Sequence, residues 1–326
     1  MSEWLYEEGI GENRAILVEG NDIIEAAIEL PGELRAGAVQ PARLTKIWVP
    51  GRRGLASLDA GGEALVEPLP AGLTEGAVLH AEIVREPIPE PGRPKRARVR
   101  ATDAPLREGA SLAQRIGRFV RPTAAGADRF EQAGWSELLE QAMNREIPFA
   151  GGALRMSVTP AMTLFDVDGG LPPAELARAG AAAAARAIRR LGIGGSIGID
   201  LPTLPGKAER QAAAAEIDAW LPPPFERTAV NGFGFLQIVR RRERPSLPEL
   251  LQADPAGAAA RALLRRAERA PGSGPVTIEA APAVIARIEG ESDWRERLRR
   301  LAGAELVLRA EAALPISGGH VQRSHS

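Results

Sequence analysis

Cysteine is absent from the 326-residue sequence, and only three histidines occur in it. Without cysteine, the chain has no disulfides, no thiolate zinc or iron–sulfur ligands and no cysteine nucleophile. His320 and His325 lie in the polar segment GGHVQRSHS, which we expect to be a flexible tail. A catalytic triad or a histidine general base would therefore depend on His80 alone, so hydrolytic chemistry would use carboxylates, metal, arginine and lysine.

Long apolar runs are lacking as well. No stretch of about 18 apolar residues occurs, and the first residues, MSEWLYEEGIGE, are acidic without an apolar core. We therefore expect no membrane span, no secretory signal and a cytoplasmic location. The net charge of −1, with 25% charged and 44% hydrophobic residues, is typical of a soluble globular protein. At roughly 150 residues per domain, this length predicts two or three domains.

Short strands separated by glycine and proline fill residues 12–102, which predicts a small closed barrel or a sandwich. Within this part, residues 85–96 (REPIPEPGRPKR) contain four prolines and predict a projecting loop. Residues 110–145 change to a helical spacing of apolar side chains. Beyond them, the pattern predicts two strands joined at Thr159 and Pro160, then alternating helices and strands, including one helix over residues 283–303.

Residues 162–201 predict a β-α-β unit whose strands end near Asp166 and at Asp200. Such crossovers leave their strands parallel, so both aspartates are expected at the carboxyl edge, where open α/β sheets bind ligands. Alternation places Asp166 and Asp168 on one face of the first strand. If that face coincides with the face of Asp200, two or three carboxylates converge and could hold Mg²⁺ or Mn²⁺, which would activate water without a protein base.

A purely structural interpretation suits the same aspartates. Asp166 and Asp168 precede a Gly-Gly pair, as turn residues do, and Asp200 precedes a proline. Spacing alone leaves both interpretations open.

Several segments together resemble one nuclease family. They are ENRAILVEGNDIIEAAIE, DRFEQAGWSELLEQAMNREIPF, GGALRM, TPAMTLFDVDGG, GGSIGIDLP and FERTAVNGFGFLQIVRRRERPSL. This set is similar to the ribonuclease E/G family over most of residues 12–247, and its most specific part is Asp166, Asp200 and the GFGF…RRR…PSL segment. The resemblance implies an α+β multidomain protein. Its parts would be a ribonuclease-H-like unit (1–33 and 106–150), an inserted RNA-binding OB-fold (34–105), a deoxyribonuclease-I-like catalytic domain (151–247) and a small C-terminal α/β domain (248–326).

The resemblance also implies roles for individual residues. Asp166 and Asp200 would hold a catalytic Mg²⁺, with Mn²⁺ as an alternative. Asp168, where the family usually has asparagine, would support this metal site, and Arg227 would stabilise charge at the scissile phosphate. The cysteines that link family members through zinc are absent after PSL, so neither zinc nor a zinc-linked assembly is expected, while a homodimer remains open.

Two family features are reduced in this chain. The barrel segment has Ser57 and Leu65 where the family usually offers aromatic side chains for base stacking. The family's 5′-phosphate sensor is shortened to RFVRPTAAGA, in which Arg121 and Thr123 resemble an Arg-Thr pair. These two residues are the candidates for contact with a 5′ end.

Basic residues gather in GRPKRARVR. A strand here would place Arg96, Arg98 and Arg100 on one face, preceded by Arg93 and Lys95. A row of guanidinium groups suits an RNA backbone, although such a row is also typical of a solvated edge that blocks strand pairing.

Three further features have competing interpretations. Arg240 and Arg242, in VRRRER, are expected to flank RNA, or else to form a solvated strand end. His80 could stack on an RNA base, but a solvated strand histidine without a role fits its pattern better. The glycines of GIGGSIG (192–198) follow a helix and enter a strand, the reverse of a dinucleotide-binding loop, so we interpret them as a helix C-cap and close packing.

We therefore expect a Mg²⁺-dependent endoribonuclease that cuts single-stranded RNA by metal-activated water attack, leaving a 5′-phosphate and a 3′-hydroxyl. The alternative is an RNA-binding protein that retains the nuclease fold with little or no turnover, since the stacking and sensor positions are both reduced.

Overall fold

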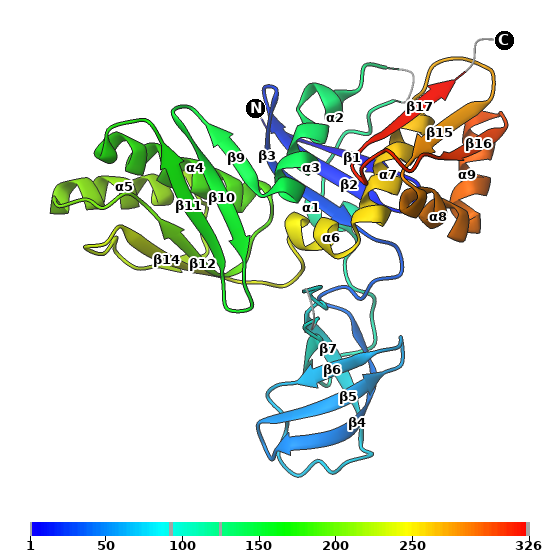
Figure 1. Ribbon diagram of the computed structural model, residues 1–326. Helices are drawn as coiled ribbons and strands as arrows, with labels where there is room; N and C mark the ends of the chain where they lie inside the picture. The colour runs from blue at the N-terminus through cyan, green and yellow to red at the C-terminus, as the bar shows by residue number, and fades with distance from the viewer. Residues whose placement is uncertain (1, 91–93, 124–125, 324–326) are drawn as a thin grey trace.

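The computed structural model describes residues 2–90, 94–123 and 126–323. It is a mixed α+β structure with one closed barrel and three further sheets. Figure 1 shows the barrel set apart at one end, with the sheets and their helices gathered above it. This arrangement agrees with an α+β multidomain protein. Within the described ranges, no helix is long and apolar enough to cross a membrane.

Five short strands form the barrel, as the glycine- and proline-rich turns predict. They are β4 (Val39–Val49), β5 (Arg53–Leu58), β6 (Glu63–Val66), β7 (Val78–Arg85) and β8 (Ala97–Ala101). They close in the order β4-β5-β6-β8-β7, with β6 and β8 parallel and the other pairs antiparallel. Alternate side chains, among them Leu44, Ala56 and Val99, point inward and are buried, so the barrel has its own core.

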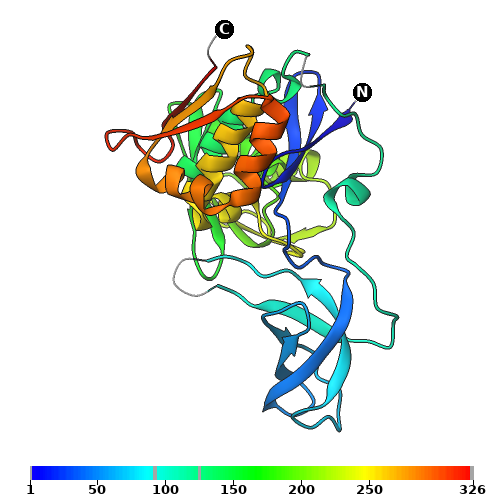
Figure 2. The same ribbon diagram turned by 90° about the vertical axis from the view of Figure 1, so that its right-hand side faces the viewer.

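The described residues of the proline-rich loop between β7 and β8, 86–90 and 94–96, extend from the barrel to the larger body of the protein (Figure 2), whereas residues 91–93 lie outside the described ranges. The backbone N–H of Glu86 donates a hydrogen bond to the Glu243 carbonyl at 2.7 Å. The Lys95 Nζ donates to the Pro160 carbonyl at 3.3 Å, and Ile88 is buried. The loop therefore connects the barrel to two segments of the larger body.

The largest sheet has six strands and contains the predicted β-α-β unit. In order across the sheet they are β13 (Phe225–Arg227), β14 (Phe235–Arg240), β12 (Gly195–Asp200), β11 (Thr163–Gly169), β10 (Gly152–Val158) and β9 (Glu146–Phe149). β11 and β12 are parallel neighbours, joined through α4 (Pro173–Arg190), and α5 (Lys207–Trp220) packs beside α4. Phe165, Ile197 and Ile238 belong to the buried core that α4 and α5 complete, whereas Asp166 and Asp200 are exposed. One face of the sheet is therefore covered and the other is open to solvent.

A three-stranded sheet near the N-terminus shares its core with this larger sheet. Its strands are β1 (Glu3–Glu8), β2 (Asn13–Glu19) and β3 (Asp22–Glu29), with helices α1 (Leu112–Ile116), α2 (Arg129–Gln132) and α3 (Trp135–Asn144) nearby. Leu5 and Trp135 belong to the same apolar cluster as Phe165. The boundary expected near residue 150 therefore lies within one continuous core. β1 is an addition to the expected strands, since the acidic start of the chain also contains the buried residues Leu5 and Tyr6.

The C-terminal part is the expected small α/β unit, with two corrections. Its elements are α6 (Leu247–Ala253), α7 (Pro255–Glu268), β15 (Val276–Ala280), α8 (Pro282–Gly290), α9 (Ser292–Ala302), β16 (Leu306–Ala310) and β17 (Gly319–Arg323). The predicted helix over 283–303 is interrupted at Glu291. The prediction of a flexible tail is wrong for residues 319–323, because β17 pairs with β15 and Val321 packs on the local core. His325 lies outside the described residues.

Candidate functional site

Asp166 and Asp200 are direct partners across the parallel strands β11 and β12. Neighbouring strands lie about 4.8 Å apart and paired residues share a face, so the two carboxylates stand side by side on the open face. Both side chains are exposed, and among the described residues neither has an ion pair or a hydrogen bond. The two strands are parallel neighbours and the faces of the two aspartates coincide, which is the condition under which we expected their carboxylates to converge.

Asp168 lies on the same face of β11 but has no partner on β12, which ends at Asp200. Arg155 of β10 is the direct partner of Asp166 and forms an ion pair with Asp168 at 3.2 Å. Asp168 thus pairs with Arg155 on the β10 side of β11, away from Asp200 on β12. In the part of the chain that the structure describes, no group of three or more acidic or histidine side chains is placed to hold a metal. A metal at this edge would depend on the pair of Asp166 and Asp200.

Two phenylalanines lie at the end of β14 that pairs with Asp200, and the sequence analysis gave neither a role. Phe235 of β14 is the partner of Asp200 across the sheet, and Phe233, in the loop before it, is 84% exposed. The Asn231 Oδ1 accepts hydrogen bonds from the backbone N–H groups of Phe233 at 2.9 Å and Phe235 at 3.0 Å. Phe235 therefore lies beside Asp200 on the sheet, and the loop that precedes it carries the exposed ring of Phe233. The only sequence signal for it was the NGFGF segment itself.

Gly234 makes this loop possible. Its φ of +94° lies in the left-handed region that favours glycine, and a Cβ there would lie 2.1 Å from the Leu201 carbonyl oxygen. The Gly234 carbonyl in turn accepts a hydrogen bond from the Leu201 N–H at 3.2 Å. The loop is thus attached to the residue that follows Asp200.

Arg227 does not lie beside the aspartates. On the edge strand β13 it is paired with Ile238, whose side chain is on the helix-covered face of the sheet. Its guanidinium forms two hydrogen bonds to Asp218 of α5, one of them at 2.7 Å. These hydrogen bonds raise the pKa of Arg227 and lower the pKa of Asp218. The expected role of Arg227 at the scissile phosphate therefore finds no geometric support, and Arg155 is the arginine next to the pair.

Arg98 and Arg100 lie on one face of β8 with Val99 buried between them, whereas Arg96 immediately precedes the strand, which is therefore shorter than the expected row of three arginines. Two of the three are engaged by acidic residues of neighbouring strands. Arg96 pairs with Glu63 at 3.0 Å and Arg100 with Glu82 at 2.5 Å. The Arg98 side chain is exposed and has no ion pair or hydrogen bond within the described residues. Arg93, which precedes this row, lies outside them.

The other predicted RNA contacts are dispersed. Lys95 is paired with Glu90 at 2.5 Å, between the barrel and the larger body. Arg242 lies beyond β14 and is paired with Glu249 and, at 3.5 Å, with Glu90. Arg240 shares the helix-covered side of β14 with Ile238, so it does not flank the aspartates.

The candidates for a 5′-end contact lie near β1. Arg121 is paired with Glu8 at 2.9 Å and stacks over the rings of Tyr6 and Phe119 at 5.2 and 5.4 Å. The side chain of Thr123 is exposed, and its carbonyl accepts a hydrogen bond from Arg269 at 3.4 Å. The structure does not bring these residues to the aspartate pair.

The chemistry of the donor set matches a hard cation. Mg²⁺ is commonly bound through one or two carboxylates, with water and substrate phosphates as its other ligands, and Mn²⁺ accepts the same oxygens. Asp166 and Asp200, exposed and otherwise unpaired within the described residues, supply two such carboxylates. His80 lies in the barrel strand β7, where its Nδ1 is 3.1 Å from the Ala104 carbonyl oxygen. The pair thus fits Mg²⁺ or Mn²⁺ better than a metal that prefers nitrogen ligands.

No protein-family model matches this chain, and no curated protein matches it either. The resemblance to the ribonuclease E/G family therefore stays a prediction from the sequence.

Proposed function

We propose that this chain is a metal-dependent endoribonuclease acting on single-stranded RNA. The observation that carries the proposal is the pairing of Asp166 with Asp200 on an open sheet face, with the exposed Phe233 in the loop that precedes the neighbouring strand β14. The carboxylates would hold Mg²⁺ or Mn²⁺, which when bound supplies Lewis-acid polarisation of a phosphate and activation of a water. The products would be a 5′-phosphate and a 3′-hydroxyl.

Side chains of the chain itself would bind and orient the substrate. Phe233 offers a ring on which a base could stack, a sequence-tolerant contact that requires an unpaired strand. Arg155 lies next to Asp166 and would attract the phosphate backbone. Arg98, on the barrel, offers a further unpaired cation for RNA.

The domain assignment belongs to the same proposal. A five-stranded closed barrel with its third and fifth strands parallel is compatible with an RNA-binding OB-fold. The six-stranded sheet with α4 and α5 would be the deoxyribonuclease-I-like catalytic domain. The N-terminal sheet with residues 106–150 would be the ribonuclease-H-like unit.

An assay of RNA cleavage tests the proposal. Purified wild-type protein should cut an unstructured, end-labelled RNA in Mg²⁺ but not in EDTA. Asp166→Asn and Asp200→Asn should each lower cleavage at least 100-fold while leaving RNA binding and thermal stability intact, because each removes one ligand charge from an exposed site. Asp168→Asn is the matched control and should stay within about threefold of wild type.

One observation favours the alternative of an RNA-binding protein with little or no turnover. Only two carboxylates converge among the described residues, and the predicted electrostatic partner Arg227 is tied to Asp218. In that case wild-type protein would bind single-stranded RNA in Mg²⁺ without cutting it. Metal-independent cleavage, or full cleavage by both asparagine variants at limiting Mg²⁺, would refute the proposed site.

A further inference from the structure

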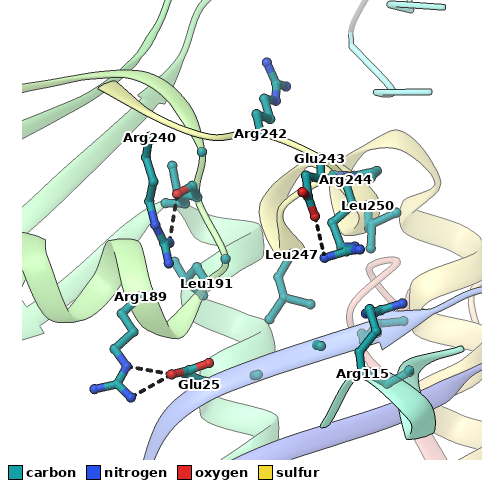
Figure 3. Close-up of a pocket in the computed structure, with 18 of the residues that line it drawn as sticks. Glu25, Arg115, Arg189, Leu191, Arg240, Arg242, Glu243, Arg244, Leu247 and Leu250 are labelled. Atoms are coloured by element: carbon teal, nitrogen blue, oxygen red, sulfur yellow. Dashed lines mark hydrogen bonds and ion pairs between the residues drawn. The ribbon is translucent and has the colours of Figure 1, made fainter. Parts of the chain in front are cut away.

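A pocket of about 540 Å³ lies between the N-terminal sheet and one end of the six-stranded sheet. Residues of β3, α1, the turn after α4 and the segment 240–250 form its walls (Figure 3). Arg240, in its wall, is paired with Gly195 at the end of β12 opposite Asp200. At about 3.3 Å per residue, roughly 17 Å of strand separates the two positions. The pocket is therefore distinct from the aspartate pair.

Arginine dominates the charged lining of this pocket. Only two acidic residues, Glu25 and Glu243, accompany six arginines, which are Arg115, Arg189, Arg240, Arg241, Arg242 and Arg244. Figure 3 shows Arg240 and Arg189 on one side and Arg115 and Arg244 on the other. Three leucines also line the pocket, and in Figure 3 Leu247 lies between the two groups, Leu191 near the first and Leu250 near the second. The pocket thus combines cationic walls with an apolar floor.

Arg240 is the least neutralised of these cations. Among the described residues it has no carboxylate partner, and its hydrogen bond goes to the Ile193 carbonyl at 3.3 Å. The guanidinium group of the nearby Arg189 forms an ion pair with the Glu25 carboxylate at 2.6 Å. Burial lowers the pKa of Arg240, Glu25 opposes this, and the charge of Arg189 lowers it further. Positive charge on this side therefore exceeds what the local carboxylates balance.

The two arginines of the opposite wall form ion pairs of 3.3 Å or longer. The Arg244 Nε lies 3.5 Å from the Glu86 carboxylate, and its Nη1 lies 3.6 Å from the Glu243 carboxylate. Arg115 is 3.3 Å from Glu29, and burial together with the charge of Arg244 lowers the pKa of Arg115. An anion between the two walls would give both guanidinium groups a further partner.

We propose that this pocket binds a nucleoside di- or triphosphate. Guanidinium groups bind phosphate through paired hydrogen bonds, and several of them facing one space suit a ligand with several phosphates. The leucine side chains form an apolar surface at the floor of the pocket. A base and sugar would cover this surface, whereas inorganic phosphate would leave it exposed to water. The volume lies within the roughly 300–1,000 Å³ typical of small-ligand sites. This inference does not depend on the nuclease proposal.

Calorimetric titration of the full chain tests this site, with ADP, ATP, GTP, inorganic tripolyphosphate and adenosine as probes. A nucleoside triphosphate should bind at least tenfold more tightly than tripolyphosphate, because only the nucleotide covers the leucine floor, and adenosine should not bind measurably. Arg240→Gln should weaken nucleotide binding at least tenfold. Arg178→Gln, which alters an exposed arginine of α4 paired with Glu216, should leave it unchanged.

Circular dichroism and the melting temperature would verify that Arg240→Gln folds, and Arg244→Gln tests the opposite wall independently. Failure of the wild-type chain to bind any nucleotide at millimolar concentration would overturn the proposal. Equal affinities for tripolyphosphate and ATP would also overturn it, since the site would then take any polyanion. A third contrary result is loss of single-stranded RNA binding in Arg240→Gln without nucleotide binding by wild type, because the pocket would then be an RNA contact.

Discussion

Arg265 should be the most sensitive single contact between the C-terminal unit and the rest of the protein. Its side chain is only 3% exposed, and it lies on α7. It forms ion pairs with Glu7 at 3.0 Å, Asp128 at 2.6 Å and Glu131 at 3.0 Å. Removing one member of a buried charge group costs about 3–5 kcal/mol, because the remaining charges stay desolvated. Arg269 still pairs with Glu7 and Asp128, so we expect the lower end of this range for Arg265→Ala.

Urea unfolding followed by tryptophan fluorescence measures this loss, since Trp294 lies in the C-terminal core and Trp135 in the main core. With an m-value of about 3 kcal/mol per M, a loss of about 3 kcal/mol lowers the midpoint by about 1 M. Arg178→Ala, which breaks an exposed ion pair, is the control and should cost less than about 1 kcal/mol. A midpoint for Arg265→Ala no lower than that of this control would refute the reasoning.

The same contact predicts a pH dependence. Burial alone would raise the pKa of Asp128, but hydrogen bonds and charge from Arg265, with help from the Glu131 N–H and Arg269, lower it. A carboxylate with a lowered folded pKa contributes stability that is complete above its unfolded pKa of about 3.9 and is lost as pH falls through the folded pKa. The gap in stability between wild type and Arg265→Ala should therefore be widest near pH 7 and should narrow below pH ~4. A gap of constant size down to pH ~2 would contradict this account of Asp128.

Three further outcomes are expected. Gly234→Ala should lower RNA cleavage at least tenfold while the circular dichroism spectrum is retained, because the new Cβ collides with the Leu201 carbonyl and displaces Phe233. Arg98→Ala should reduce the log–log salt dependence of single-stranded RNA binding by about 0.7, whereas an unchanged slope would mean that this arginine is only solvated. RNAs with a 5′-monophosphate and a 5′-hydroxyl should be cut at rates within about threefold, because Arg121 is engaged by Glu8 and Tyr6. A tenfold preference for the monophosphate, abolished by Arg121→Ala, would contradict this last expectation.

The aspartate pair could be located from the sequence because its position depends on local rules. Strand alternation fixes the face of each residue, and the β-α-β crossover fixes the direction of the two strands. Both rules operate within residues 162–201, where α4 is long and strongly amphipathic. The barrel was predictable for a similar reason, since each of its strands is bounded by glycine or proline turns.

Features that depend on distant pairing could not be predicted in this way. Arg227 occupies a three-residue edge strand, and a shift of one residue in its register would have placed it on the aspartate face. The role of Arg155 requires knowing that β10 pairs with β11 so that Arg155 meets Asp166. β17 looks like a polar tail until β15 supplies its partner, because only Val321 and Gly319 contact the core.

The open face of the six-stranded sheet holds two like charges side by side, Asp166 and Asp200. Like charges directly opposite each other on neighbouring strands destabilise a sheet, and among the described residues no ion pair neutralises Asp166 or Asp200, because Arg155 pairs with Asp168 instead. These carboxylates contribute nothing to the apolar core, since the core lies on the other face of the sheet. Residues that lower the stability of the folded protein and make no compensating contact are expected at functional sites. A bound divalent cation would reverse the repulsion, which is why the asparagine variants should fold at least as stably as the metal-free wild type while losing the proposed activity.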